Sequence, residues 1–414
     1  MNSWAFIFSP CRGGVFLKSH STPLPMALLC SPPSTQTHPI PRILQMPTAD
    51  DKVQSAEAWT DFCDQLKKAG DVILREDLET TLFDRGEGLR YLGRLLRAGL
   101  FSFGENPGPE FPIFRPMPDG VKMGLDNPDN YYVSASINPR LDYRIRGKRG
   151  TIHYLSFAAQ NQNFAAKDKI TGGAGHLNDS ELKVEADGSF EILASQNEQP
   201  GNWLRTTDQT RQILIRQTFL HRDKEQPVEV EIECLQATGT PSPLEPDRVP
   251  GQLMGAALYA MGCAQWFADW VMEFPQKAPI NDFHLPDLEK HRVMGGDPNI
   301  RMWLGMWNLA PDEALVIDAM PPKCDYWNFQ LANIWAESLD SRNHRVHVNS
   351  GGAVYRDDGS FRIVVAHEDP DAENWIETAG HHHGVMALRW VRTDAHPKPS
   401  VRVVKISEAR TGLD

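Results

Sequence analysis

The sequence predicts an α+β protein that is mainly β, with two tandem antiparallel β-sandwich or jelly-roll-like units, an N-terminal helical segment and a linking helix. Three observations lead to this fold class. Short segments rich in Val, Ile and aromatic residues are separated by turn-forming residues. Several of these segments recur later in the chain at a nearly constant separation. Apolar residues at helical spacing precede the first β-rich region and connect it to the second.

Length and composition limit the class of protein. The chain has 414 residues, enough for two or three domains that each bury a core. With 54 Asp and Glu against 42 Lys and Arg, its formal net charge is -12, which argues against a nucleic-acid partner. The six cysteines form no CxxC pair, so neither a disulfide framework nor a zinc ribbon is expected. We expect a cytoplasmic protein without an integral membrane segment, because no apolar run is long enough to span a bilayer.

Residues 1–45 differ in composition from the rest of the chain. They contain Arg12, Lys18 and Arg42 but no acidic residue, together with many Ser, Thr and Pro. We interpret them as a disordered leader or a misassigned start, with Met46 as the true start. Mitochondrial targeting is the alternative, although prolines at 23, 25, 32 and 33 would interrupt the amphipathic helix that it requires.

Residues 46–120 are expected to form an N-terminal helical segment followed by a Pro-rich link. Apolar residues recur at helical spacing over residues 55–68, and Gly70 is the expected end of this helix. A second helix is expected over residues 84–100, with leucines on one stripe and arginines on the other. The five prolines between 107 and 118 exclude helix and central strand from the link.

The first β-rich unit is assigned to residues 121–247 and the second to residues 293–414, with the linking helical segment at 248–292 between them. Four residue pairs hold the register of the duplication at separations of 172, 172, 171 and 172 residues: Ile145 and Ile317, Phe157 and Phe329, Gly188 and Gly359, and Trp203 and Trp375. We therefore expect the two units to superpose with Trp203 over Trp375 and Phe157 over Phe329.

Histidines are concentrated in the second unit. His381 and His383 would face the same side of a strand, where they could share a ligand. His367 and Asp369, with a histidine of the 381–383 triplet, could form the ligand set of a non-haem Fe(II) oxygenase. Against this, only 11 to 13 residues separate Asp369 from the triplet. Hydrogen-bonded or exposed imidazoles are the simpler interpretation, so the metal stays unknown, no cofactor is predicted and Fe(II) is the alternative.

Carboxylates and tryptophans of the second unit complete the candidate site. A carboxylate beside an aromatic wall would suit proton chemistry on an apolar substrate. The catalytic candidates are Glu337, Asp340, His367, His381 and His383, and the substrate-binding candidates are Trp327, Trp335 and Arg389. We expect Glu337, Asp340, His367 and at least one of His381 and His383 to line a common concave surface, with Trp327 or Trp335 in its wall. The alternative is a core strand whose acidic residues cap the adjoining turns.

Five segments carry a family resemblance: PPKCDYWNFQLANIWAESLD (321–340), NSGGAVYRDDGSFRIVVAHEDPDAENWIETAGHHHGVMALRW (349–390), VRVVKI (401–406), DRGEGLRYLGRLLRAGL (84–100) and DNPDNYYVSASI (126–137). Over about residues 55–407 the chain resembles an uncharacterised family related to domain of unknown function 1214. The resemblance implies a β-sandwich-like C-terminal domain and an association with enzymes that act on steroids, terpenoids and other lipophilic molecules. It implies no reaction that could be assigned to named residues.

The sequence thus favours processing of a lipophilic small molecule of terpenoid, steroid or polyketide type in specialised metabolism. The chemistry expected is non-redox acid/base chemistry, as in an isomerase, cyclase, lyase or hydrolase, in a pocket of the second unit. The alternatives are a non-haem iron oxygenase and a non-catalytic glycan- or metabolite-binding protein. A small hydrophobic substrate is the expected partner, and the oligomeric state does not follow from the sequence.

Overall fold

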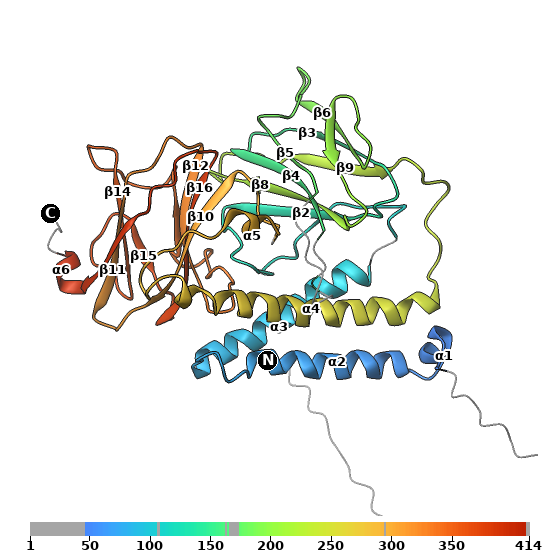
Figure 1. Cartoon of the computed structure of the whole chain (residues 1–414), viewed down its shortest axis with the longest axis horizontal. Coiled ribbons are helices and arrows are strands. Elements are labelled where there is room, and N and C mark those ends of the chain that lie inside the picture. Colours follow the sequence, from blue (N-terminus) through green and yellow to red (C-terminus); the bar gives the residue numbers. More distant parts are fainter. Residues whose placement is uncertain (1–45, 106–107, 162–163, 165–173, 294, 411–414) are drawn as a thin grey trace, which may run out of the picture. The chain divides into compact units, whose positions relative to one another are not determined.

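The computed structural model describes residues 46–105, 108–161, 164, 174–293 and 295–410. From residue 47 on, the described residues form one compact unit, in which helices lie beside two β-sandwiches (Figure 1). The leader predicted for residues 1–45 lies outside the described residues. The fold class predicted from the sequence is confirmed, because four sheets are arranged in two tandem units with a helical segment before them and a helix between them.

Three helices open the described chain: α1 (Ala49–Gln54), α2 (Glu57–Ile73) and α3 (Leu82–Phe103). Helix α2 continues past Gly70, where the sequence analysis ended it, because Val72 and Ile73 are buried in the core between the helices. Helix α3 begins after Thr81. The Thr81 hydroxyl accepts a hydrogen bond from the Asp84 N–H, and the Asp84 carboxylate accepts one from the Thr81 N–H.

The first unit is a sandwich of two sheets. One sheet has the order β1-β2-β8-β4-β5. Its strands are β1 (Arg115–Pro116), β2 (Asn130–Ser136), β4 (Tyr154–Gln160), β5 (His176–Asn178) and β8 (Gln212–Thr218). The other has the order β7-β6-β3-β9. Its strands are β3 (Tyr143–Lys148), β6 (Ser189–Ser195), β7 (Asn202–Arg205) and β9 (Glu229–Cys234). Phe157 and Ile215 of one sheet pack against Ile145 and Ile192 of the other in the core.

The second unit repeats this arrangement. One sheet has the order β10-β16-β12-β13. Its strands are β10 (Ile300–Asn308), β12 (Tyr326–Ala332), β13 (His347–Asn349) and β16 (His383–Val391). The other has the order β15-β14-β11-β17. Its strands are β11 (Glu313–Ala319), β14 (Phe361–Ala366), β15 (Trp375–Glu377) and β17 (Ser400–Lys405). Each strand from β2 to β9 therefore has a counterpart in β10 to β17 at the same place in its sheet.

Equivalent side chains support the duplication. Trp203 in β7 donates from Nε1 to the Ser195 carbonyl at 3.0 Å, and Trp375 in β15 donates to the Ala366 carbonyl at 3.1 Å. The sequence predicts antiparallel strands in both units, but β6 and β7 are parallel, as are β14 and β15. In each case the chain crosses back to the same end of the sheet before the second strand begins.

The linking segment contains η1 (Pro246–Arg248), α4 (Val249–Val271), η2 (Phe274–Gln276) and α5 (Leu288–Val293), and α6 (Ile406–Arg410) follows the last strand. Helix α4 lies beside α2 and α3 and runs beneath both sandwiches (Figure 1). A Cβ at Gly99 would lie 2.7 Å from the Ala256 carbonyl oxygen, so glycine at this position lets α3 approach α4 closely. Among the described residues, no helix is long and apolar enough to cross a membrane.

The outer face of one sheet in the second unit is covered by these helices. Leu304 of β10 and Val385 and Ala387 of β16 share a core with Ala260 and Ala264 of α4. A sheet whose outer face is apolar must be covered in this way, because exposed apolar area is unfavourable in water. This core joins the helices to the second sandwich.

The loops that precede β2 and β10 join the two units to each other. Asp129 accepts a hydrogen bond from the Tyr326 hydroxyl of the second unit at 2.5 Å. Asp297 accepts one from the Tyr154 hydroxyl of the first unit at 2.9 Å. Tyr154 and Tyr326 occupy equivalent positions in β4 and β12, 172 residues apart. Each unit thus supplies a carboxylate to the tyrosine of the other.

A histidine completes each of these pairs. His347 Nε2 of β13 lies 3.1 Å from Asp129 Oδ1, and His176 Nε2 of β5 lies 3.1 Å from Asp297 Oδ1. Burial alone would raise the pKa of both carboxyl groups, but the hydrogen bonds that they accept hold both pKa values below the ordinary range. Asp129 and Asp297 are therefore buried, ionised and stabilised by partners from the opposite unit.

We predict that Asp297→Asn lowers the free energy of unfolding by about 3 kcal/mol at pH 7, because it breaks a buried, hydrogen-bonded charge. The pKa of Asp297 is lower in the folded chain than in the unfolded chain. Its contribution is therefore present above the ordinary Asp pKa and is lost as the pH falls toward the folded value. Urea denaturation at a series of pH values should show the difference shrinking below about pH 4.

The exposed Asp223, changed to Asn, serves as the control and should alter the free energy of unfolding by less than about 0.5 kcal/mol. A difference between wild type and Asp297→Asn that stayed constant as the pH fell below 4 would contradict the charged state assigned to Asp297.

Candidate functional site

Two of the predicted catalytic histidines hold α3 against the second unit. His381 Nε2 lies 2.7 Å from Glu87 Oε2, and His383 Nε2 lies 2.8 Å from Asp84 Oδ2. Asp84 and Glu87 are about one helical turn apart at the start of α3, so both face the same side. The hydrogen bond with Asp84 raises the pKa of His383. These histidines therefore pair with carboxylates of the helix.

Glu337 belongs to the same contact. Its Oε1 accepts a hydrogen bond from Arg94 Nη1 of α3 at 2.6 Å, and its Oε2 accepts one from Asn333 Nδ2 at 3.0 Å. Asn333 Nδ2 also donates to Glu87 Oε2 at 2.9 Å. Burial raises the pKa of Glu337, and Arg94 opposes that shift. The carboxylate is enclosed in a polar network that docks α3 onto the second sandwich.

The other two catalytic candidates lie elsewhere. His367 Nδ1 lies 2.8 Å from the Thr378 hydroxyl oxygen, and its Nε2 lies 3.1 Å from the Leu309 carbonyl oxygen. Asp340 is exposed and accepts a hydrogen bond from Asn343 Nδ2 at 2.8 Å. Over the residues that the structure describes, no group of three or more His, Cys, Asp and Glu side chains is placed to hold a metal ion.

The two tryptophans predicted to bind substrate are fully buried. Trp327 stacks on Phe361 with ring centroids 4.0 Å apart, and Trp335 donates from Nε1 to the Asp84 carbonyl at 2.8 Å. The polar atoms of Glu337, His381 and His383 are thus paired across a packed helix contact. Of the candidates, Arg389 alone lines the cavity described next.

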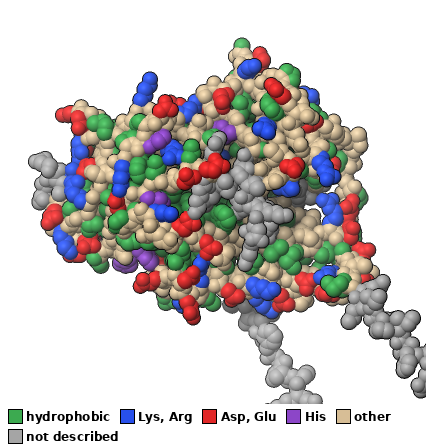
Figure 2. Space-filling view, viewed as in Figure 1, with side chains coloured by type: hydrophobic (Ala, Val, Ile, Leu, Met, Phe, Trp, Pro, Cys, Tyr) green, Lys and Arg blue, Asp and Glu red, His purple; other side chains and the backbone are tan. Residues whose placement is uncertain are grey.

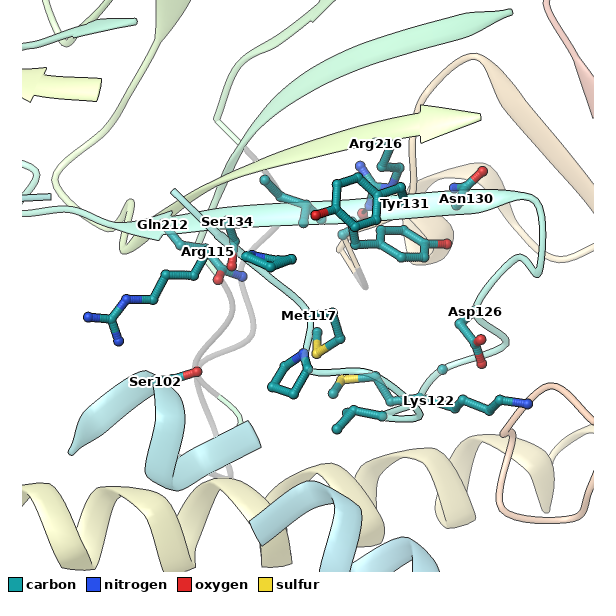
Figure 3. A pocket seen from close by; sticks show the side chains of 18 of the residues that line it. Ser102, Arg115, Met117, Lys122, Asp126, Asn130, Tyr131, Ser134, Gln212 and Arg216 are labelled. Atoms are coloured by element: carbon teal, nitrogen blue, oxygen red, sulfur yellow. Dashed lines mark hydrogen bonds between the residues drawn. The ribbon is translucent and has the colours of Figure 1, made fainter. Parts of the chain in front are cut away.

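A cavity of about 1630 Å³ lies beneath the first unit. Its roof is the outer face of β2 and β8, and α4 and the end of α3 form the opposite side. Residues 113–129, from the end of the Pro-rich link to the loop that precedes β2, lie along one side, where Figure 3 shows Met117, Lys122 and Asp126 across from Ser134, Gln212 and Arg216. On the outer surface viewed in Figure 2, acidic and basic side chains of the described residues are interspersed.

The duplication explains why the cavity lies beneath the first unit. On the outer face of that unit Ser134 pairs with Leu214, and at the equivalent place in the second unit Leu304 pairs with Ala387. One step along the strands, the pair Ser136 and Gln212 corresponds to the pair Met306 and Val385. The second face is apolar and covered by α4. The first face is largely polar, and a cavity separates it from the same helix.

The wall opposite the polar face is aromatic. Phe164 lies 6.0 Å from Tyr259 and 5.7 Å from Phe267 between ring centroids, and Phe267 lies 6.3 Å from Trp270. Tyr259, Phe267 and Trp270 come from α4, and all four residues line the cavity. A cavity with one aromatic wall and one polar wall suits a molecule that has both kinds of surface.

Two charged residues in the segment before β2, Lys122 and Asp126, provide titratable groups in the cavity wall. Lys122 donates from Nζ to the carbonyl groups of Ser338 and Leu339 at 2.7 and 2.6 Å. Asp126 accepts hydrogen bonds from the N–H and the hydroxyl of Ser338 at 3.0 and 2.7 Å. Burial lowers the pKa of Lys122 and raises the pKa of Asp126. Both side chains line the cavity, and the charge of each acts on the pKa of the other (Figure 3).

Lys122 and Asp126 are not among the residues predicted from the sequence, although the duplication carried a signal for the cavity. Aligning the strands of the two units places Ser134 and Ser136 opposite Leu304 and Met306. A polar face in one copy and an apolar face in the other indicate that only one copy is covered by helix. Lys122 and Asp126 lack such a signal, because burial shifts their pKa values and the segment that they contact, around Ser338, lies more than 200 residues away in the chain.

Comparisons with known proteins provide a family and a fold. A family model described as "Protein of unknown function (DUF1214)" matches residues 134–218 and 314–395. A crystal structure of an uncharacterized protein from Burkholderia cenocepacia is 40% identical with a TM-score of 0.83, covering 87% of this chain and 99% of that one. A protein from Vibrio parahaemolyticus is 12% identical with a TM-score of 0.43, covering 81% of this chain and 100% of that one. No curated protein matches the chain.

We predict that His383→Gln lowers the free energy of unfolding by about 1.5 kcal/mol at pH 6, because it removes a charge-assisted hydrogen bond to Asp84. The pKa of His383 is raised in the folded chain. Its contribution is therefore present below the ordinary His pKa and is lost as the pH rises through the raised value. Denaturation curves recorded between pH 5 and 9 should show the difference shrinking toward the alkaline end.

His382→Gln is the matched control, because His382 is the exposed neighbour of His383. It should leave the free energy of unfolding nearly unchanged across this pH range. If His383→Gln cost the same at pH 5 and pH 9, the protonated imidazole would not be the stabilising species.

Proposed function

The chain belongs to the family related to the protein of unknown function DUF1214, and we propose that it binds a lipophilic small molecule in the cavity beneath its first unit and acts on it by non-redox acid/base chemistry. The substrate class proposed is terpenoid, steroid or polyketide. The proposed location differs from the one expected from the sequence, which was a pocket of the second unit.

The single observation that carries this proposal is the pair formed by Asp126 and Lys122 in the cavity wall. Burial shifts the pKa of the acid upward and the pKa of the base downward, so the two values move toward each other and toward neutral pH. Groups with such shifts, placed in a cavity, are candidates for general acid and general base catalysis. A bound molecule could give a proton to one group and receive a proton from the other, as in an isomerisation or elimination.

The size and lining of the cavity support the choice of substrate. Ligand sites for small molecules are mostly apolar, with a few polar groups that fix orientation. Tyr259, Phe267 and Trp270 provide flat apolar surface on α4, whereas Ser134 and Gln212 provide polar groups on the facing strands. At about 1630 Å³ the cavity is large enough for a molecule of several fused rings.

A non-catalytic metabolite-binding protein is the second candidate. Lys122 already donates to two carbonyl groups, Ser338 and Leu339, which restricts the movement of its ammonium group. A group held in this way suits a binding site as well as a catalytic one. The two candidates share the cavity and differ only in whether the bound molecule is converted.

We predict that Asp126→Asn lowers turnover at least 100-fold, the lower range for loss of a general acid or base, while the affinity for substrate changes only a few-fold. Purified protein would be incubated with a panel of terpenoids, steroids and polyketides, and binding and conversion would be measured by mass spectrometry. If the ionised carboxylate is the base, wild-type turnover should rise with pH through the raised pKa of Asp126.

Asp340→Asn is the control, because Asp340 is exposed and is not among the residues lining the cavity. It should retain full turnover. Binding by wild type without conversion of any member would leave the binding protein as the function, and full turnover by Asp126→Asn would remove the acid/base role from that residue.

A further inference from the structure

Arg216 and Arg389 occupy equivalent positions in the two units. Arg216 lies in β8 opposite Ser156 of β4, and Arg389 lies in β16 opposite Asn328 of β12. Each donates from Nη2 to a backbone carbonyl of the loop that precedes β2 or β10, Gly295 for Arg216 and Leu125 for Arg389. The duplication has therefore kept the arginine and one of its partners.

The two arginines differ in the partners of their Nη1 atoms. Arg389 Nη1 donates to the side-chain oxygens of Asn328 and Gln330, at 3.3 and 2.5 Å. Arg389 is buried and its hydrogen bonds lie within the protein. Arg389 therefore packs the sheet that contains β16 against the loop that precedes β2.

Arg216 lacks both of these acceptors. The residues of β4 equivalent to Asn328 and Gln330 are Ser156 and Ala158. The Ser156 hydroxyl donates to Asp297 at 2.7 Å, and Ala158 has no polar side-chain atom. Within the part of the chain that the structure describes, Arg216 Nη1 is buried without a hydrogen-bond partner, and Arg216 lines the cavity.

The charged groups near Arg216 do not occupy this nitrogen. The charge of Arg216 contributes to the low pKa of Asp297, but the Asp297 carboxylate accepts hydrogen bonds from Tyr154 and Ser156 and lies 3.1 Å from His176 Nε2. Burial lowers the pKa of His291, another lining residue, to about 4, so its imidazole is neutral at pH 7. A buried donor on a cation that lacks a partner is costly, and an anionic oxygen offsets that cost best.

We infer that the molecule held in this cavity carries a carboxylate, whose oxygen accepts a hydrogen bond from Arg216 Nη1 while its apolar body lies against the aromatic residues of α4. This inference rests on the proposed use of the cavity for a lipophilic molecule. The planar guanidinium group matches the planar carboxylate in shape and charge. The ligand class is therefore a lipophilic carboxylic acid.

Matched pairs of ligands test the inference. The free acids and methyl esters of a linear fatty acid, a naphthoic acid and a bile acid would be titrated into the full chain by calorimetry. The acid should bind at least about tenfold more tightly than its ester for one or more of the three skeletons, as expected for a hydrogen bond to a charged group. Arg216→Met, which keeps the length of the side chain and removes its charge, should abolish this preference.

Ala158→Gln tests the same contact from the protein side. It restores the acceptor that Gln330 supplies to Arg389, so it should engage Arg216 Nη1 and reduce the affinity for acids while leaving the affinity for esters unchanged. Ala186→Gln, in an exposed turn, is the control and should change neither. If Ala158→Gln fails to fold, Arg216→Met carries the test alone.

Equal binding of acids and esters by wild type would overturn the carboxylate site and leave the lipophilic cavity in place. A preference for acids that persists in Arg216→Met would also overturn the carboxylate site, because a group other than Arg216 would then bind the carboxylate. If no acid or ester binds, both the carboxylate site and the proposed function fail.

Discussion

Two buried carboxylates hold the architecture together, since Asp129 and Asp297 each bind a tyrosine of the opposite sandwich. Removing such a group from water is costly unless hydrogen bonds replace the lost hydration, and here the replacement comes from across the unit boundary. The relative placement of the two sandwiches is thereby fixed. Helix α4 can then run beneath both, cover one outer sheet face and leave a cavity under the other.

The cavity follows from a difference between two copies of one fold. Leu304 and Ala387 bring apolar surface to the outer face of the second unit, and this surface is stable only under a helix. Ser134 and Gln212 at the matching face of the first unit have no such requirement, because polar side chains can face water or a ligand equally well. The same helix therefore makes a packed core at one end and the wall of a cavity at the other.

The fold was predictable from the sequence because its signals are local. Asp-Gly turns, short β-branched segments and the constant separation of Trp203 and Trp375 are visible in the chain itself. The parallel pairing of β6 with β7 was not predictable, because the relative direction of two strands depends on how the connection between them returns to the sheet. Local signals therefore identified the strands but only part of their pairing.

The contacts of the candidate site residues could not be predicted from the sequence, because their partners are distant in the chain. Taken alone, His381 and Glu337 have side chains suited to catalysis. Their partners lie on α3: Glu87 is 294 residues from His381, and Arg94 is 243 residues from Glu337. Arg389 was predicted to bind substrate; it lines the cavity, and its hydrogen bonds to Asn328, Gln330 and Leu125 pack the second sheet against the loop that precedes β2. Its counterpart Arg216 passed unnoticed, because the missing acceptor at Ala158 is apparent only once the strands are aligned.

The reciprocal exchange of carboxylates also bears on how such a chain could arise. Residue i of one unit contacts residue j of the other, and the equivalents of i and j make the same contact in reverse, which is the isologous pattern of a dimer with a dyad axis. An ancestral single sandwich with one such loop would bury its tyrosine correctly only by pairing with an identical chain. Fusion of the two chains would then free each half to change separately. Asn127-Pro-Asp129 in one half and Asp297-Pro-Asn299 in the other are such a divergence, because the acid and the amide have exchanged places while each loop still reaches the tyrosine opposite.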